Sequence, residues 1–296
     1  MGGSRSGSRR ALALTAGFLR YAGVASLAIF GVDCTETLDA GHNRPPDPCA
    51  ARDAALTGCV PPGLVDNLIG YWRLDEEPGS TIAHDSSGRG NDGILHGLDA
   101  STAWVAGRWQ GALELGHAGW VQVASSADID SIADSITVSA WVDLEGTISP
   151  SDIFGTALSR QTGMGIDQYY HLSLLMNGRP NLLINTLSGF QSFAGPEPAP
   201  KGTWTHLATV YDGAVARLYV NGVEVANKDL TGSFAPDTTS IIIGGNDNDA
   251  SGVPTELFPG RLDEVALYAR ALSAAEIAQL AAGALSPAGY RDAGAD

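Results

Sequence analysis

The amino-acid sequence predicts an all-β sandwich, and three observations support that prediction. From Leu68 onward, short runs rich in β-branched and aromatic residues alternate with Gly, Asn, Asp and Pro, a spacing typical of a β-sandwich. In residues 136–142, large apolar side chains alternate with small polar ones, as in a half-buried strand. Only residues 273–282 have a helical pattern, so we expect one short C-terminal helix.

Nine runs have the composition of strands. They are residues 68–74, 120–123, 136–143, 170–176, 182–186, 205–211, 215–220, 240–243 and 261–268. Asn221-Gly222 separates the run at 215–220 from a further β-rich stretch that begins at Val223. Because Asn and Gly adopt positive φ at little cost, we expect a hairpin over residues 214–226. Ser273 and Glu276 have the spacing of a capping box, and Gly283 is expected to end the helix.

Length and composition limit the protein class. The 296 residues (30.6 kDa) suffice for one large domain or two small ones. With 44% hydrophobic and 17% charged residues, the chain can bury a core, which excludes a disordered acidic polymer. The 17 Lys and Arg against 33 Asp and Glu give a net charge of −16. Nucleic acid is therefore not an expected partner, whereas carboxylates are available for a hard cation.

The N-terminus has the pattern of an export signal over residues 1–33. Three arginines within the first ten residues precede an apolar stretch at 11–32 that only Arg20 interrupts. The same stretch is long enough for a membrane anchor, but an arginine near its middle costs about 2.5–3.5 kcal/mol on insertion scales, which favours a signal peptide. We expect a secreted or cell-envelope protein that meets a membrane only through its N-terminus.

Residues 34–67 have the composition of a stalk, with five prolines and no sustained apolar period. Cys34 follows the apolar stretch as the lipid-bearing cysteine of a bacterial lipoprotein does, but Asp33 stands where such sites have a small uncharged residue. In an exported protein, Cys49 and Cys59 most simply form a disulfide. Pairing of Cys34 with either of them, or with a second chain, is the alternative.

Five segments follow the stalk in order: YWRLDE at 71–76, DSSGRGNDG at 85–93, WTHLATVYDG at 204–213, LYVNG at 218–222, and GRLDEVALY at 260–268 with RALS at 270–273. Together they resemble the laminin-G-like, concanavalin A-like lectin/glucanase family of secreted bacterial proteins. The resemblance covers about residues 68–283, leaving 284–296 as a tail. It implies a jelly-roll sandwich of two antiparallel sheets, often with one structural calcium, and usually a binding or adhesion role instead of catalysis.

Calcium takes six to eight oxygen ligands, commonly carboxylates and the carbonyls of a glycine-rich turn. Residues 85–93 supply such a turn, and we expect Asp75, Asp85, Asn91 and Asp263 near the ion. The family resemblance supports Asp263 most. The alternative is that Asp85 and Asn91 form a turn by hydrogen bonding to nearby backbone, and that Asp75 caps a strand end in solvent.

Two loops contain candidate ligand-binding residues. Asn246 and Asp247 lie in an Asn- and Asp-rich loop that can bind a cation or sugar hydroxyls at the sandwich edge, although such loops are usually solvated turns. Tyr169 and Tyr170 follow a loop at 163–168 and are expected to form an exposed platform. The tryptophans at 104, 109, 120, 141 and 204 mostly alternate with apolar neighbours, which predicts core packing.

Signatures of catalysis are missing from the sequence. Jelly-roll glucanases carry Glu-x-Asp-x-x-Glu on one strand face, but none of the ten glutamates here has Asp two positions later. The motifs Gly-x-Ser-x-Gly, His-Glu-x-x-His and Gly-x-x-x-x-Gly-Lys are also absent. We therefore expect an exported, non-enzymatic module that binds a glycan or a cell-surface protein, with a structural calcium. The alternative is a structural or adhesive cell-envelope protein anchored through its N-terminus.

Overall fold

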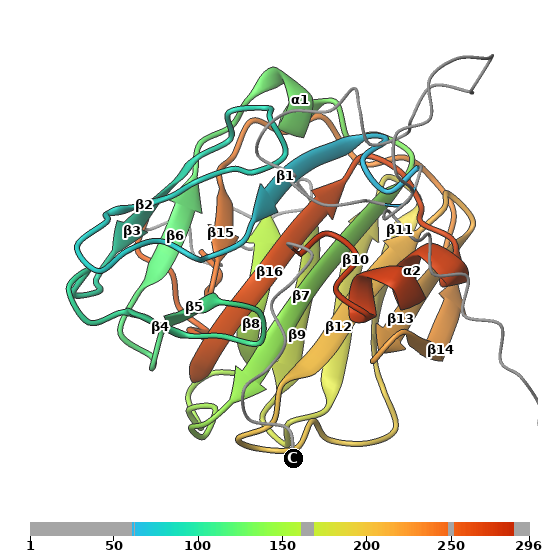
Figure 1. Cartoon of the computed structure of the whole chain (residues 1–296). Coiled ribbons are helices and arrows are strands. Elements are labelled where there is room, and N and C mark those ends of the chain that lie inside the picture. Colours follow the sequence, from blue (N-terminus) through green and yellow to red (C-terminus); the bar gives the residue numbers. More distant parts are fainter. Residues whose placement is uncertain (1–60, 62, 161–168, 248–251, 287–296) are drawn as a thin grey trace, which may run out of the picture. The chain divides into compact units, whose positions relative to one another are not determined.

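The computed structural model describes residues 61, 63–160, 169–247 and 252–286 (Figure 1). All described residues belong to one compact unit of the chain. The predicted export signal and all three cysteines lie outside the described residues. Among those that are described, no helix is long and apolar enough to cross a membrane.

Two antiparallel sheets of eight strands each form the fold, here called sheets A and B. Sheet A has the order β14-β13-β12-β7-β16-β5-β4, and β1 also pairs with β16 (Figure 1). Its strands are β1 (Leu68–Trp72), β4 (Trp104–Ala106), β5 (Gly111–Glu114), β7 (Ile136–Leu144), β12 (Thr205–Tyr211), β13 (Val215–Val220), β14 (Val223–Asp229) and β16 (Gly260–Tyr268).

Sheet B lies behind sheet A in Figure 1 and has the order β11-β10-β9-β8-β15-β6-β3-β2. Its strands are β2 (Ile82–Ala83), β3 (Gly93–His96), β6 (Trp120–Val123), β8 (Phe154–Arg160), β9 (Tyr169–Leu175), β10 (Pro180–Thr186), β11 (Gly189–Ala194) and β15 (Ile241–Ile243). The jelly-roll sandwich expected from the sequence is confirmed.

The main core lies between the two sheets, because each strand places alternate residues on one face. Val138 and Val142 of β7 meet Val121 and Val123 of β6 in one continuous apolar cluster. A second, smaller cluster covers the other face of sheet A, where helix α2 (Ala274–Ala281) contributes two buried side chains, Ile277 and Leu280. Since apolar contacts cover both faces of sheet A, β7 is buried at all nine of its positions.

The hairpin and the C-terminal helix form as the sequence predicts. Asn221 and Gly222 connect β13 to β14 with φ of 48° and 80°, the left-handed pair that a two-residue hairpin turn requires. Helix α2 begins after Ser273, whose side chain accepts from the Glu276 backbone N–H while the Glu276 carboxylate accepts from the Ser273 backbone. Gly283 follows the helix with φ of 78°.

Several short elements were not predicted. Strands β2 to β5 have only two to four residues each, too few for a periodic pattern to stand out. The sequence of β11 is typical of a loop, because it is mostly Gly, Ser, Gln and Ala around two phenylalanines. Strand β8 was missed because it has small residues at its centre. The single-turn helix α1 (Ala127–Asp130), capped by Ser126, was also missed.

Gly93 in β3 gives a test of how closely the short strands pack. A Cβ at this position would lie 2.3 Å from Cγ1 of Val121, which is fully buried. We expect Gly93→Ala to lower the free energy of unfolding by about 1–3 kcal/mol, since extra volume in a packed core forces neighbours to shift. Urea unfolding of Gly93→Ala, Val121→Ala and the double variant measures the coupling. The double variant should lose less stability than the sum of the single variants, and strict additivity would contradict the assigned contact.

Candidate functional site

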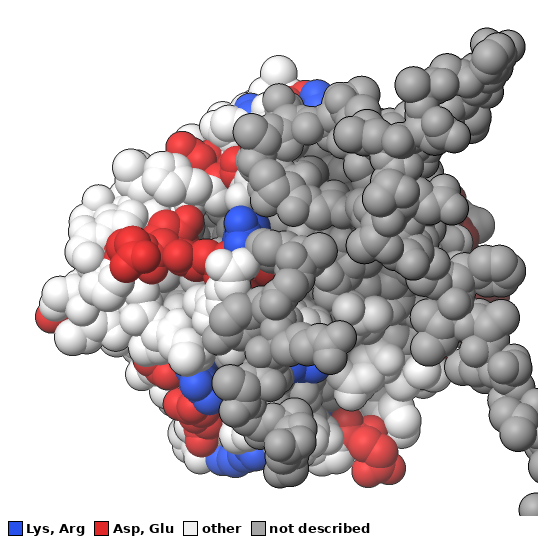
Figure 2. All heavy atoms as spheres, viewed as in Figure 1, with Lys and Arg blue, Asp and Glu red and all other residues white. Residues whose placement is uncertain are grey.

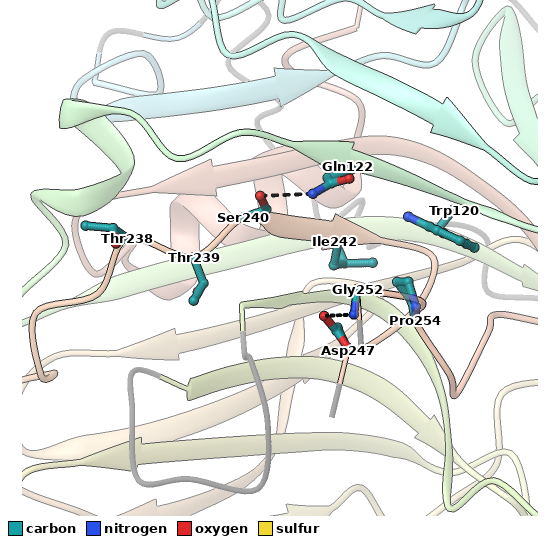
Figure 3. Close-up of a pocket in the computed structure, with 9 residues that line it drawn as sticks. All are labelled: Trp120, Gln122, Thr238, Thr239, Ser240, Ile242, Asp247, Gly252 and Pro254. Carbon is teal, nitrogen blue, oxygen red and sulfur yellow. Dashed lines mark hydrogen bonds between the residues drawn. The ribbon is translucent and has the colours of Figure 1, made fainter. Parts of the chain in front are cut away.

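A shallow pocket of about 200 Å³ lies on the outer face of sheet B, over β6 and β15 (Figure 3). The strands supply side chains that point away from the core, and the loops on either side of β15 supply the rest. The lining residues are Trp120, Gln122, Thr238, Thr239, Ser240, Ile242, Asp247, Gly252 and Pro254. None of these nine residues is Lys or Arg.

Trp120 provides a partly exposed aromatic wall for the pocket (Figure 3). It pairs across the strands with His96, and the two rings stack with centroids 5.4 Å apart and planes 16° apart. The stacking fixes the orientation of the indole, so the aromatic surface is already in place before a ligand arrives. Its Nε1 donor is buried and has no hydrogen-bond partner in the described structure.

Polar groups surround this aromatic wall. The Gln122 side-chain amide donates to Ser240 Oγ at 3.2 Å, and Asp247 Oδ2 accepts from the Gly252 backbone N–H at 3.2 Å (Figure 3). The other carboxylate oxygen of Asp247 is buried without a described hydrogen-bond partner. The pocket thus combines an apolar ring with hydroxyl, amide and carboxylate groups, the mixture that small polar ligands with apolar faces require.

Arg160, the last residue of β8, holds the loop that precedes β15. Its side chain is fully buried and ion-paired with Asp130 (2.5 Å) and Asp237 (3.4 Å). The same guanidinium donates to the backbone carbonyls of Ile129, Asp237 and Thr239. Because a buried guanidinium has five donors that need acceptors, this cluster fixes the polypeptide from which the pocket's threonines and Ser240 project.

The predicted ligand-binding residues separate in the structure. Asp247 lines the pocket, whereas Asn246 is buried behind it and donates to Glu256 Oε2 at 3.0 Å. Tyr170 is 1% exposed and packs against Phe234 in the core, so its expected exposure is wrong. The reason is the alternation along β9, which turns Tyr170 inward. Tyr169 begins β9, and its side chain lies outside the described structure.

The tryptophans do not share one environment. Trp104 lies in the core, as expected, and Trp141 is buried on the other face of sheet A. Trp109, Trp120 and Trp204 are partly exposed. The exposure of Trp120 could have been predicted from the local sequence Trp-Val-Gln-Val. Alternation places Trp120 on the same face as the polar Gln122 and opposite the two valines. The pocket hydroxyls at 238–240 had no comparable signal.

Asp85 organises the glycine-rich turn through hydrogen bonds alone. Its Oδ1 accepts from the backbone N–H groups of Tyr71 (2.9 Å) and Ser87 (2.8 Å). Its Oδ2 accepts from Ser87 Oγ (2.8 Å) and the Asn91 backbone N–H (2.9 Å). Asn91 is buried and donates from Nδ2 to the Ile69 carbonyl at 2.6 Å. This geometry matches the turn-forming alternative described above.

Asp263 and Glu264 form a second buried acidic site, at an irregularity in the pairing of β16 with β7. Asp263 Oδ2 accepts from the backbone N–H groups of Arg108 (2.8 Å) and Trp109 (3.0 Å), while Oδ1 is buried without a described partner. The Tyr71 hydroxyl donates to Glu264. Burial, followed by repulsion from Glu264, raises the pKa of Asp263 well above its usual range, and burial raises the pKa of Glu264 to about 7.

The four predicted calcium ligands all make hydrogen bonds or ion pairs of their own in the described structure. Each carboxylate oxygen of Asp85 already accepts two hydrogen bonds, three of them from its own turn and one from the Tyr71 backbone N–H in β1. Asp75 is ion-paired with Arg73 and also accepts from the Gly111 backbone N–H at 2.7 Å. Within the described ranges, no group of three His, Cys, Asp or Glu side chains is arranged to hold a metal ion. Calcium binding stays a prediction.

The two packed antiparallel sheets and the pocket on an outer sheet face define a lectin-like jelly roll. The chain belongs to the concanavalin A-like lectin/glucanases superfamily, whose family model matches residues 115–278. All nine pocket residues lie within that range. The resemblance to the concanavalin A-like lectin/glucanase family inferred from the sequence is confirmed.

Solved structures with the same fold include binding domains. Domain 4 of AbnA, a GH43 extracellular arabinanase from Geobacillus stearothermophilus, solved with arabinotriose, matches with a TM-score of 0.55 and 21% identity, covering 73% of this chain and 98% of that one. The binding domain of Paraclostridial Mosquitocidal Protein 1 has a TM-score of 0.55 and 18% identity, with 74% and 52% covered. At these identities the likeness shows the fold alone.

A sequence relative of known name is pappalysin-1 from Mus musculus. It is 29% identical over an alignment of 147 residues, and the match covers 42% of this chain and 9% of pappalysin-1. The human protein matches over the same number of residues at the same identity. The chain therefore spans less than a tenth of the length of these relatives.

The buried Arg160 should be a main source of stability for the pocket loop. Arg160→Met leaves Asp130 and Asp237 without their cation, and we expect the free energy of unfolding to fall by about 3–5 kcal/mol. The matched control is Arg217→Met, which removes a half-exposed arginine paired with Asp212 at 2.6 Å and should cost at most about 1 kcal/mol. Denaturant unfolding compares the two, and equal losses would contradict the role given to Arg160.

Asp85→Ala separates the turn-forming role from calcium binding. Loss of four hydrogen bonds to one carboxylate should lower the free energy of unfolding by about 1–3 kcal/mol, by the same amount in calcium and in chelator. Thermal unfolding of the wild type and the variant in both buffers measures this. If calcium stabilises only the wild type, Asp85 is a calcium ligand and the turn-forming assignment is wrong.

Proposed function

We propose that this protein is a non-catalytic module that binds neutral glycans through the pocket beside Trp120. The observation that carries the proposal is a stacked, partly exposed indole on an otherwise polar sheet surface, rimmed by Gln122, Ser240 and Asp247. Sugar rings have apolar C–H faces that pack on aromatic rings and hydroxyl edges that exchange hydrogen bonds with amides, hydroxyls and carboxylates.

Unsatisfied polar atoms at the pocket add to this argument. Trp120 Nε1 is a donor without an acceptor, and Asp247 Oδ1 is an acceptor without a donor, among the described residues. Each buried polar atom left without a partner costs about 1–3 kcal/mol. A glycan that displaces the neighbouring side chains would recover part of this cost, because its hydroxyls can accept from the first atom and donate to the second.

Charge favours neutral over acidic sugars. The pocket contains Asp247 and lacks a lysine or arginine among its described lining residues, and the chain has a net charge of −16. Figure 2 shows the sheet A side of the molecule, where the acidic side chains of the described residues occur in several separate places. A uronic or sialic acid would therefore meet repulsion without a compensating cation.

The structural neighbours support a binding role in general. One is the domain of an extracellular arabinanase solved with arabinotriose, and others are binding domains of a mosquitocidal protein and of a botulinum neurotoxin. The likeness to a Trypanosoma rangeli sialidase covers 33% of that chain. Asp263 and Glu264, whose carboxyl pKa values are raised, are at most 7% exposed, which also favours binding over hydrolysis. A secreted or cell-surface location, with a Cys49–Cys59 disulfide, remains part of the proposal.

Trp120→Ala tests the proposal directly. The full-length protein is screened against arabinotriose and the corresponding xylo-, manno- and cello-oligosaccharides, with a uronic-acid trisaccharide as the acidic comparison. We expect a neutral glycan to bind and Trp120→Ala to weaken its affinity about tenfold. The variant removes the packing of a sugar ring on the indole, at a cost near 1.4 kcal/mol. NMR-monitored titration gives the dissociation constants.

The matched control for this experiment is Trp204→Ala, which removes another partly exposed tryptophan, one that contacts Arg261 next to sheet A. It should leave glycan affinity unchanged. Binding that is lost with Trp204 and kept without Trp120, or a preference for the acidic trisaccharide, would show that the site lies elsewhere.

A further inference from the structure

The outer face of sheet B continues the pocket toward the edge of the sheet. The antiparallel register places Ile82 of β2 opposite Ile94 of β3, Ile94 opposite Gln122 of β6, and Gln122 opposite Ile242 of β15. Directly paired residues of antiparallel strands share a face. These four residues, here called the outer row, therefore lie side by side on one surface, and the last two also line the pocket.

The isoleucine side chains of the outer row are more exposed toward the edge of the sheet than in the pocket. Ile242 is 5% exposed at the base of the pocket, whereas Ile94 is 56% and Ile82 38% exposed. Ala83, which follows Ile82, and Gly93, which precedes Ile94, are the buried residues of these two strands, so the two isoleucines are not needed to fill the core. Neighbouring exposed aliphatic side chains beside a binding pocket are typical of a contact surface.

We propose that the site binds an extended neutral oligosaccharide, with one sugar ring in the pocket against Trp120 and the following rings over Ile94 and Ile82. This inference rests on the proposed glycan-binding function. Strands in a sheet lie about 4.8 Å apart, so the outer row spans three such steps, about 14 Å, which is longer than a single sugar ring. The aliphatic side chains offer contact to the C–H faces of sugar rings without selecting a charge.

Continuity with the pocket identifies the occupant as the same chain of sugars. Gln122 belongs to both the outer row and the pocket rim, and its amide already donates to Ser240. A ligand that leaves the pocket along the sheet meets Ile94 next, because β3 is the strand that pairs with β6. A second copy of the chain would find a small surface here, since β2 has only two residues.

The experiment compares ligand length in the full chain. Dissociation constants for arabinose, arabinotriose and arabinohexaose, with the xylose series in parallel, are measured by NMR titration for the wild type, Ile94→Ser and Ile82→Ser. We expect affinity to rise from the mono- to the trisaccharide in the wild type. Ile94→Ser should weaken trisaccharide binding about tenfold, equivalent to 1.4 kcal/mol, and leave monosaccharide binding unchanged. Val223→Ser is the control, because Val223 is 66% exposed but belongs to β14 of sheet A.

Each outcome decides between the proposals. Equal affinity for the mono- and trisaccharides in the wild type, or equal loss for both in Ile94→Ser, overturns the extended site and leaves the pocket intact. Failure of every sugar in both series to bind overturns the outer row as a glycan surface together with the pocket. A dimer in sedimentation velocity that Ile94→Ser converts to monomer would assign the outer row to a second copy of the chain instead.

Discussion

The structure depends on the alternation of residues between the two faces of strands β6 and β15 in sheet B. A shift of one residue in register would exchange the faces of a whole strand. In β6, Val121 and Val123 fill the core, which obliges Trp120 and Gln122 to face outward. The same rule in β15 turns Ile242 outward between its two core neighbours. Burial of the core and assembly of the pocket are thus consequences of one register.

The alternation of faces is interrupted in β16, and two buried acidic residues, Asp263 and Glu264, lie at the interruption. Three steps of β16, from Asp263 to Ala266, oppose two of β7, and Glu264 adopts a left-handed φ of 52°, which is costly for a residue with a Cβ. Leu262 and Val265 both belong to the core, so the two acidic residues between them both face away from it. Two adjacent carboxyls then share one desolvated surface, which is why burial and mutual repulsion raise the pKa of Asp263.

The sequence predicted the fold well because its evidence is local. The longer strands repeat with period two, and the Asn221-Gly222 turn and the Ser273 cap each act within a few residues. The candidate site was predicted only in part. Asp247 was found from its loop chemistry, but Tyr170 was misplaced because the boundary of β9 decides its face. The hydroxyls before β15 reach the pocket through Arg160, which is 79 residues away from Thr239 in sequence, and no short-range pattern records such a contact.

Arg160 contributes both to the stability of the fold and to the preorganisation of the pocket. Its side chain is tied to two carboxylates and three carbonyls, and the Asp237 carboxylate in turn accepts from the backbone and the hydroxyl of Thr239. The loop is therefore ordered by folding, before any ligand is present. When the binding groups are already ordered, a ligand binds without the further loss of side-chain and loop entropy that would otherwise weaken its affinity. Together with the stacked pair His96 and Trp120, this preorganisation would favour the proposed binding of a neutral glycan in a shallow pocket with few hydrogen-bonding groups.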